Sequence, residues 1–252
     1  MSLHFGCTPL ELTDAQINDY LLLLRDRQNP SFSYFKHTVY GLRYVFRLIG
    51  REDKAIRLPS IQRIKDLPAV LSQAECRLFF KTPKLLKHRI LLTLIYSAGL
   101  RTAEITNLRQ ADIDFDRMLI HVRQGKGKKD RYVPLSRYMA QGLKKYYQSV
   151  LPKTWVFNGK QYGTPFSKRG VQFVVRTTLK KSGIQKKVTA HTLRHSYATH
   201  LLEDGLDIVT IQKLLGHECI STTLVYLHVA QTVTQRAYSP LDILYKKNNE
   251  KG

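Results

Sequence analysis

Residues 191–229 hold the most constraining pattern in this chain of 252 residues. The stretch reads HTLRHSYATHLLEDGLDIVTIQKLLGHECISTTLVYLHV, and it is typical of short helices joined by turns. His191 and Arg194 stand three positions apart, so on a helix they share one face. His217 follows a helix that a glycine ends, and Tyr226 falls on the next short helix. Two histidines, one arginine and one tyrosine in such a run predict a phosphate-binding site that carries its own nucleophile.

Three strings within this run carry a family resemblance. They are HxLRH, which ends at His195, LLGH, which spans Leu214 to His217, and the tyrosine a fixed step beyond. Their order and spacing resemble the signature of the tyrosine recombinases, also called the phage integrase family, and within it the Xer-like site-specific recombinases. The resemblance implies a mainly α fold with a small antiparallel β-sheet. It also implies two domains, a helical core-binding domain and a mixed α/β catalytic domain of the DNA breaking and rejoining type.

The chain is strongly basic, with 41 Lys and Arg against 19 Asp and Glu, a formal net charge of +22 and a pI near 10.0. Such a charge predicts a polyanionic partner whose binding weakens with salt, because bound counterions are released. On charge alone, a generically basic surface or a ribosome-associated protein is the alternative. The basic residues are spread along the whole chain, so we do not expect a membrane-binding helix.

The cysteines and the lack of long apolar runs indicate the cellular compartment of the protein. Cys7, Cys76 and Cys219 are odd in number and far apart, which favours a reducing cytoplasm over a disulfide framework. No apolar run is long enough to span a membrane, and the start, MSLHFGCTPL, does not resemble a secretory signal. We expect a cytoplasmic protein.

Residues 1–66 predict a small helical unit with a linker. Thr13 and Gln16 form a capping box before one helix, and a second helix is expected from Ser31 to Gly50, with its apolar side running on to Ile49. Basic residues interleave with that apolar side, and we expect three of them to contact the DNA backbone: Lys36, Arg43 and Arg47. A solvated face is the alternative.

The resemblance assigns residues 1–66 to the core-binding domain, which clamps DNA from the far side. The segment is short for that domain, with room for two or three helices. A reduced clamp and the loss of an N-terminal portion both remain open. The catalytic domain with its C-terminal tail would then cover residues 67–252, because Pro68 discourages helix through the junction and Ser72 opens a new capping box.

Arg101 follows a buried helix that Gly99 ends, at the start of a further short helix where an anion is favoured. Taken alone, an arginine in this position is usually structural. The string AGLRTAEITNL resembles the first catalytic arginine box of the family, which makes Arg101 a candidate. Glu104 would then fix the guanidinium of Arg101, or would serve only as an acid favoured at a helix start.

Residues 112–123 and 131–135 predict two strands joined by a basic, glycine-rich turn. The string GKGKKDRYVPL resembles the β-hairpin lysine motif of the family, and Lys126 matches its lysine. The resemblance implies that Lys126 protonates the departing 5′ oxygen. Lys128, Lys129 and Arg131 are interpreted as charges that position the DNA backbone. On the helix expected from Ser167 to Lys181, Lys168 and Arg169 lie on a basic face that contacts either DNA or solvent.

These residue types suggest how a phosphodiester is attacked without a metal. Arg101 and Arg194 can each present a planar fork to its non-bridging oxygens. Tyr226 would be the nucleophile, and removing its proton near neutral pH costs about 4 kcal/mol at the ordinary pKa of about 10. We expect the two arginines to lower that pKa. His217 would add a hydrogen bond, and His191 would assist proton transfer or hold the site in register. The family implies a 3′-phosphotyrosyl intermediate.

We expect no cofactor and no metal. His191 and His195 are four apart, a spacing that can bind metal, but no acidic third ligand stands nearby. His195 and His200 are interpreted as core or helix-surface histidines.

The expected partner is double-stranded DNA with inverted-repeat core sites. The resemblance implies a homo-oligomer, with a dimer on each site and a tetramer that joins two sites through a Holliday junction. The apolar cluster Leu241 to Tyr245 would dock into a neighbouring protomer or fold back onto its own domain. Two other functions stay open, a catalytically silent protein that uses Asp207 to Tyr226 as a helix-turn-helix, and a type IB topoisomerase.

Overall fold

The computed structural model describes residues 1–28, 32–51, 53, 54, 56, 67–123 and 130–230. The chain divides into two compact units, Met1–Asp66 and Leu67–Gly252, here called the first and second unit. None of the described helices is both long enough and apolar enough to cross a membrane.

The first unit contains helices α1 (Ser2–Phe5), α2 (Asp14–Gln28) and α3 (Phe32–Leu48). The predicted capping box is confirmed, because the Thr13 amide donates to Gln16 Oε1 over 2.9 Å and the Gln16 amide donates to Thr13 Oγ1 over 3.3 Å. Ile49 was expected on the apolar side of α3, but it lies beyond the end of the helix and is 47% exposed. The small core consists of Leu12, Ile17, Leu21, Leu24, Phe35, Val39, Phe46 and Ile56.

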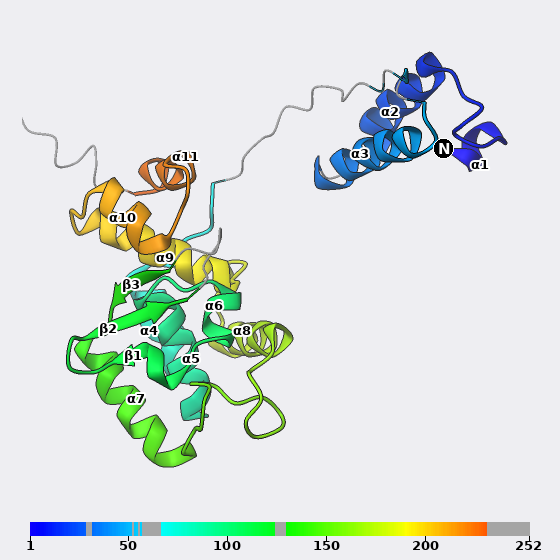
Figure 1. Cartoon of the computed structure of the whole chain (residues 1–252). Coiled ribbons are helices and arrows are strands. Elements are labelled where there is room, and N and C mark those ends of the chain that lie inside the picture. The colour runs from blue at the N-terminus through cyan, green and yellow to red at the C-terminus, as the bar shows by residue number, and fades with distance from the viewer. Residues whose placement is uncertain (29–31, 52, 55, 57–66, 124–129, 231–252) are drawn as a thin grey trace, which may run out of the picture. The chain divides into compact units, whose positions relative to one another are not determined.

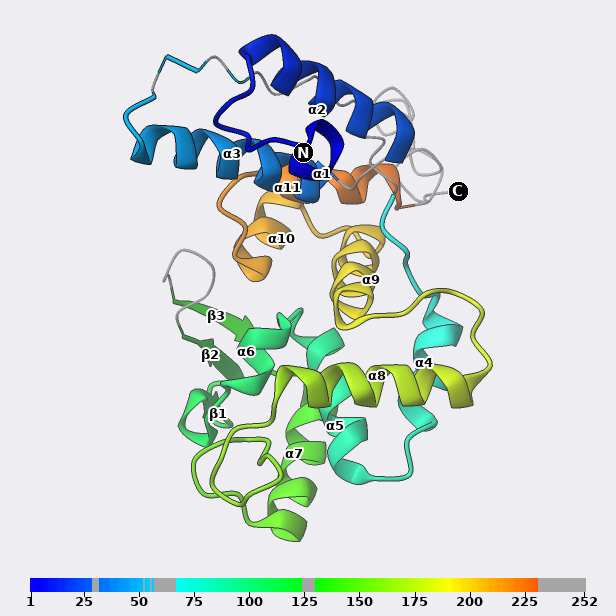
Figure 2. The ribbon, with the colours of Figure 1, turned by 90° about the vertical axis from the view of Figure 1, so that its right-hand side faces the viewer.

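The second unit is built around helix α5 (Leu86–Ser97), which packs against α7 (Arg137–Val150) and α9 (Ala190–Glu203). Helix α4 (Gln73–Lys81) and helix α8 (Lys168–Ser182) pack on its other sides, as Figures 1 and 2 show. Five apolar residues of α5 are buried: Ile90, Leu91, Leu92, Leu94 and Ile95. This core fixes α5 and α9, whose ends carry the site described below.

A three-stranded antiparallel sheet lies beside these helices, with the order β1 (Ile113–Asp114), β2 (Leu119–Val122) and β3 (Arg131–Pro134). Ile120 pairs with Val133, and both side chains are buried, as alternation along a half-buried strand requires. The prediction of one strand over residues 112–123 is wrong. A 3-10 helix η1 (Gln110–Asp112) precedes β1, and a turn with Met118 at φ 55 separates β1 from β2.

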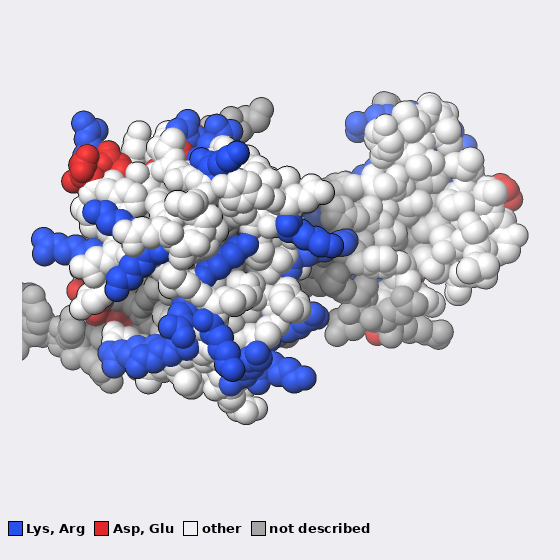
Figure 3. All heavy atoms as spheres, turned by 90° about the horizontal axis from the view of Figure 1, so that it is seen from below, with Lys and Arg blue, Asp and Glu red and all other residues white. Residues whose placement is uncertain are grey.

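Short helices complete the second unit. Helix α6 (Thr102–Thr106) follows α5, and α10 (Ile208–Leu215), α11 (Ser221–Leu224) and the 3-10 helix η3 (Val225–His228) follow α9. Gly216 ends α10 with φ 62 in the left-handed conformation that glycine favours. In the space-filling view of Figure 3, Lys and Arg side chains are scattered over the visible face of the second unit, and most of the few visible Asp and Glu lie at one edge.

Candidate active site

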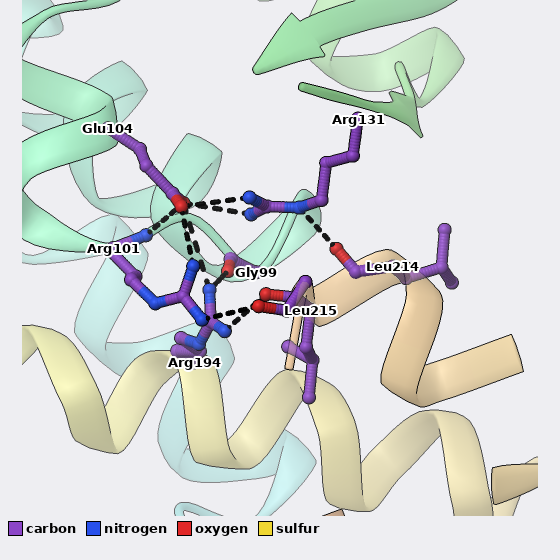
Figure 4. Close-up of polar contacts among 8 residues, drawn as sticks. Gly99, Arg101, Glu104, Arg131, Arg194, Leu214 and Leu215 are labelled. Atoms are coloured by element: carbon purple, nitrogen blue, oxygen red, sulfur yellow. Dashed lines mark hydrogen bonds and ion pairs between the residues drawn. The ribbon is translucent and has the colours of Figure 1, made fainter. Parts of the chain in front are cut away.

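Three arginines converge on the C-terminal end of helix α10, where backbone carbonyls lack helical partners. Each guanidinium takes a different carbonyl, at N···O distances of 2.7, 2.6 and 2.9 Å. Positive charge is favoured at a helix C-terminus, because the helix dipole is negative there. The contacts, partly drawn in Figure 4, pair Arg131 with Leu214, Arg194 with Leu215 and Arg101 with Gly216.

Glu104 on α6 binds the same three arginines from the opposite side (Figure 4). Its carboxylate accepts hydrogen bonds of 2.8 Å from Nη1 of Arg101 and from both terminal nitrogens of Arg131. It also lies 3.7 Å from Nη1 of Arg194. Burial alone would raise the pKa of Glu104, but the hydrogen bonds and charge of Arg131 outweigh it and lower the pKa to about 2. Glu104 is therefore ionised at neutral pH and holds three like charges together. Its predicted role in fixing Arg101 fits this geometry.

Arg131 differs from its expected role. We expected it to position the DNA backbone, but its side chain is only 10% exposed, and Nε, Nη1 and Nη2 each donate within the protein. The guanidinium of Arg131 ties the start of β3 to α6 and to the end of α10. Lys126, Lys128 and Lys129 lie outside the described residues.

Arg194 projects from α9 into the interior and is 3% exposed. Its Nη1 donates to the carbonyl of Gly99 over 2.5 Å, so it joins the end of α5 to the end of α10. Gly99 has φ 59, and a Cβ on it would lie 2.6 Å from the ring of Tyr197. Both its backbone angle and the close packing therefore require glycine. Burial and the charge of Arg101 lower the pKa of Arg194 to about 10, which leaves it protonated at neutral pH.

The two predicted histidines lie on different elements beside these arginines. His191 is one helical turn before Arg194 on α9, and burial and the charge of Arg194 lower its pKa. His217 follows α10, and its Nδ1 lies 2.9 Å from Oγ1 of the buried Thr223. Burial and the charges of Arg194 and Arg101 lower the pKa of His217 to about 4. Both rings are therefore neutral at pH 7.

Tyr226 on η3 is 1% exposed, and its hydroxyl lies 3.0 Å from Nδ1 of His195. Burial raises the pKa of Tyr226, and the charges of Arg194 and Arg101 offset this only in part. The expectation that the two arginines bring the pKa of this phenol below its ordinary value is therefore wrong for this structure. His195 was interpreted as a core or surface histidine. Its position four residues after His191, on the same helix face, was the signal in the sequence.

A pocket of about 360 Å³ joins these groups. It gathers five of the six residues expected in the catalytic set, Arg101, His191, Arg194, His217 and Tyr226, and adds His195. The sixth, Lys126, is outside the described residues. A larger hollow of about 740 Å³ also has Arg101 in its lining, together with Arg109 and Arg123. The smaller pocket contains Tyr226 together with three histidines, His191, His195 and His217.

The expected DNA-contacting residues are divided between the two units. On α3, Arg47 is exposed, Lys36 lies with Nζ 5.3 Å from the centre of the Tyr40 ring, and Arg43 donates to the carbonyl of Ile56 over 2.9 and 2.6 Å. Lys168 and Arg169 are exposed in the first turn of α8. Part of the Arg43 guanidinium is therefore used inside the first unit, whereas Lys168 and Arg169 remain accessible.

Comparison with known proteins shows the family to which the chain belongs. The sequence profile of the Phage integrase family matches residues 69–232. The chain is 37% identical to tyrosine recombinase XerA of Thermococcus kodakarensis over 84% of this chain and 76% of that protein. It is 32% identical to tyrosine recombinase XerC of Lacticaseibacillus casei over 94% of this chain and 84% of that protein.

A solved structure extends the likeness to the fold. The XerH site-specific recombinase, bound to its palindromic difH substrate in a post-cleavage complex, superimposes with a TM-score of 0.74. The match covers 94% of this chain and 72% of that one, at 21% identity. The family match places the chain in the class of enzymes that break and rejoin DNA strands. The chain belongs to the phage integrase family, the tyrosine recombinases.

Proposed function

We propose that this chain recombines DNA at specific sites, with Tyr226 as the nucleophile and a 3′-phosphotyrosyl intermediate. The observation that carries the proposal is the pocket in which Tyr226 lies beside Arg101, Arg194 and three histidines. An ester bond between Tyr226 and phosphorus conserves the energy of the broken phosphodiester, so a 5′ hydroxyl of another strand can reverse the step.

The two arginines bind the phosphate and stabilise its transition state. Each guanidinium has five N–H donors. In Arg101 and Arg194 only some of these are used by Glu104 and backbone carbonyls, which leaves donors for the non-bridging oxygens. Because Glu104 and the α10 carbonyls fix both side chains before DNA binds, little reorganisation is needed when charge develops on phosphorus.

The neutral histidines and the hairpin lysine complete the set. His217, held through Nδ1 by Thr223, directs its other ring nitrogen to a phosphate oxygen as a hydrogen-bond donor. His191 assists proton transfer near the leaving group. Lys126 protonates the departing 5′ oxygen, as its match to the family motif implies.

Exposed cations outside the pocket position the DNA backbone. We assign this role in the second unit to Lys168 and Arg169, together with Lys128 and Lys129 of the hairpin. Residues 1–66 act as the DNA clamp, and the exposed Arg47 and the partly exposed Lys36 of α3 face the duplex. The net charge of +22 is consistent with a binding surface on each unit.

The substrate is a duplex with an inverted repeat, on which two copies of the chain bind and then pair with a second site to form a tetramer. The palindromic substrate of XerH supports this, because a two-fold symmetric site matches a symmetric protein dimer. The segment Leu241 to Tyr245, which lies outside the described residues, docks into the neighbouring copy. A chain truncated after Pro240 that still assembles on DNA with unchanged cooperativity would disprove this docking.

The test uses a duplex that the full chain selects from a pool of random DNA sequences, called the selected duplex below. We expect the protein to form a denaturation-resistant adduct with this duplex without added metal, and to exchange strands between two labelled copies. Tyr226→Phe should bind the duplex and form no adduct. Relaxation of a single supercoiled plasmid without any strand exchange would instead identify a type IB topoisomerase, and binding without an adduct would identify a silent DNA-binding protein.

A further inference from the structure

The hydroxyl of Tyr226 has a partner that the functions above do not use. Nδ1 of His195 lies 3.0 Å from the phenolic oxygen, and the two ring centres are 5.7 Å apart. Tyr226 is 1% exposed, so a hydroxyl in this position requires a partner within the protein. His195 is therefore in direct contact with the atom that attacks phosphorus.

His195 lies close both to the phenol and to the groups proposed to bind phosphate. It lies one helical turn after His191 and directly follows Arg194 on α9, and the rings of His191 and His195 have centres 6.5 Å apart. His195 also lines the pocket that contains both arginines. A proton that reaches this ring is inside the site, next to the phosphate, and not in bulk solvent.

We propose that His195 is a further catalytic residue, the base that accepts the phenolic proton of Tyr226 as the tyrosine attacks. The inference rests on the proposed role of Tyr226 as the nucleophile. It assigns to His195 a task distinct from those of His191 and His217, whose described contacts do not include the phenol.

The O–H bond of Tyr226 breaks, and its proton moves to Nδ1 of His195, while the phenolic oxygen forms a bond to phosphorus. The bond from phosphorus to the 5′ oxygen breaks, and that oxygen takes a proton from Lys126. When a 5′ hydroxyl attacks the intermediate, the imidazolium of His195 returns its proton to the departing phenolic oxygen.

The protonation state of His195 suits a base. Burial, followed by the charges of His191 and Arg194, lowers its pKa to about 4, so the ring is neutral and can accept a proton at neutral pH. An anionic phosphodiester in the pocket favours the protonated form, and so makes the neutral ring a stronger base when substrate is present. Besides His191 and Arg194, the titratable and charged groups around the pocket are Arg101, His217, Glu218, Cys219 and Tyr226.

The same helix supplies a matched control. His200 lies on α9, and its Nδ1 is 2.8 Å from the hydroxyl of Tyr96 on α5. The Tyr96–His200 pair has the same kind of hydrogen bond as Tyr226 and His195, but neither Tyr96 nor His200 lines the pocket. A substitution at His200 therefore reproduces the loss of a hydrogen bond on α9 without changing the group that contacts Tyr226.

The experiment measures single-turnover cleavage of the selected duplex across a range of pH for wild type, His195→Asn, His195→Ala and His200→Asn. The asparagine oxygen at position 195 can accept the hydrogen bond of Tyr226 but cannot take its proton. We expect both variants at 195 to cleave about 100-fold or more slowly than wild type. We also expect the fall in rate at low pH, where His195 becomes protonated, to be absent in His195→Asn. His200→Asn should keep the wild-type rate and pH profile.

A second substrate separates nucleophile activation from leaving-group protonation. A selected duplex with sulfur in place of the scissile 5′ oxygen has a leaving group that needs no proton. We expect this substrate to restore cleavage by Lys126→Ala but not by His195→Asn. Melting temperature and duplex binding of each variant show whether it is folded.

Two results overturn the inference alone. One is a His195→Asn variant that cleaves within a few-fold of wild type, which would show that His195 only holds the phenol. The other is rescue of His195→Asn by the sulfur substrate, which would place His195 in the leaving-group step. If wild type forms no adduct, or Tyr226→Phe forms one, the proposed function itself fails, and this failure is distinguishable from the other two.

Discussion

Arg131 and Glu104 form a bidentate ion pair, in which Nη1 donates to Oε1 and Nη2 donates to Oε2, both over 2.8 Å. A bidentate pair of this kind fixes both position and orientation. Because Nε of Arg131 also donates to the carbonyl of Leu214, the pair connects the start of β3, helix α6 and the end of α10. Arg131 is the first residue of β3, five positions after Lys126 in the sequence, and it shares Glu104 with Arg101 and Arg194.

Replacing Arg131 by lysine should impair both stability and cleavage. An ammonium cannot make three separate contacts in this geometry, so Glu104 and the Leu214 carbonyl would lose partners. We expect unfolding in urea to show a loss of about 3 kcal/mol, the scale for breaking a buried pair. Cleavage of the selected duplex by the folded variant should fall at least tenfold.

The control for Arg131 is Lys186→Ala, which removes a surface pair with Glu75 at 2.7 Å in which the Lys186 side chain is 46% exposed. Exposed pairs of this kind contribute about 1 kcal/mol or less. An Arg131→Lys variant as stable and as active as Lys186→Ala would show that the triple contact of Arg131 is dispensable.

Glu104 should make stability depend on pH in the acid range. Its pKa is about 2 in the folded protein and 4.5 for the ordinary group, so its ionisation stabilises the fold above pH 4.5 and this contribution is lost as the pH falls toward 2. The difference corresponds to about 3 kcal/mol. In urea unfolding, Glu104→Gln should be less stable than wild type at pH 7. The difference in unfolding free energy between the two proteins should shrink as the pH falls from 4.5 toward 2. A gap that stays constant with pH would contradict the assigned charge state.

Gly99 should not tolerate a side chain, for two separable reasons. An alanine would have to adopt φ 59, and its Cβ would lie 2.6 Å from the ring of Tyr197. Gly183 has a similar φ of 70 with nothing within 4 Å of a Cβ, so Gly183→Ala reports the backbone strain alone, about 1 kcal/mol. We expect thermal unfolding to show a clearly larger loss for Gly99→Ala, and lower cleavage as well because Arg194 binds the Gly99 carbonyl. Equal losses in stability at the two positions would mean that the close packing has no effect.

The salt dependence of DNA binding should reveal the backbone contacts of α8. Each phosphate contact contributes about 0.9 to the slope of log affinity against log salt. Lys168→Ala and Arg169→Ala should therefore each lower the slope by about 1, measured by fluorescence anisotropy with the selected duplex. Lys153→Ala, at an exposed residue outside the proposed interface, serves as the control. Identical slopes for all three variants would remove α8 from the interface.

Local signals explain how much of this molecule the sequence could predict. The Thr13 capping box and the end of α10 at Gly216 depend on neighbouring residues, and the structure agrees with both. The role of Arg131 could not be predicted, because its partners are 27 and 83 positions away in the chain. Arg131 looks like one more surface cation in a basic turn until the fold brings Glu104 to it.

The same limit applied to the tyrosine. Its partner His195 is 31 positions away, and only the packing of η3 against α9 brings the two together. The raised pKa of Tyr226 was missed for a related reason, because the depth of burial of a side chain depends on the tertiary fold. The spacing of the signature residues indicates which groups share the site, and their contacts decide which group holds which proton.

The most direct test of the account is to identify the amino acid that becomes linked to DNA. After reaction with the selected duplex, digestion with a protease and a nuclease followed by mass spectrometry should yield a peptide with a nucleotide joined through its 3′ phosphate to Tyr226. The opposite DNA end should carry a free 5′ hydroxyl. A nucleotide on any other residue, such as Tyr197, or a linkage through a 5′ phosphate, would contradict the account.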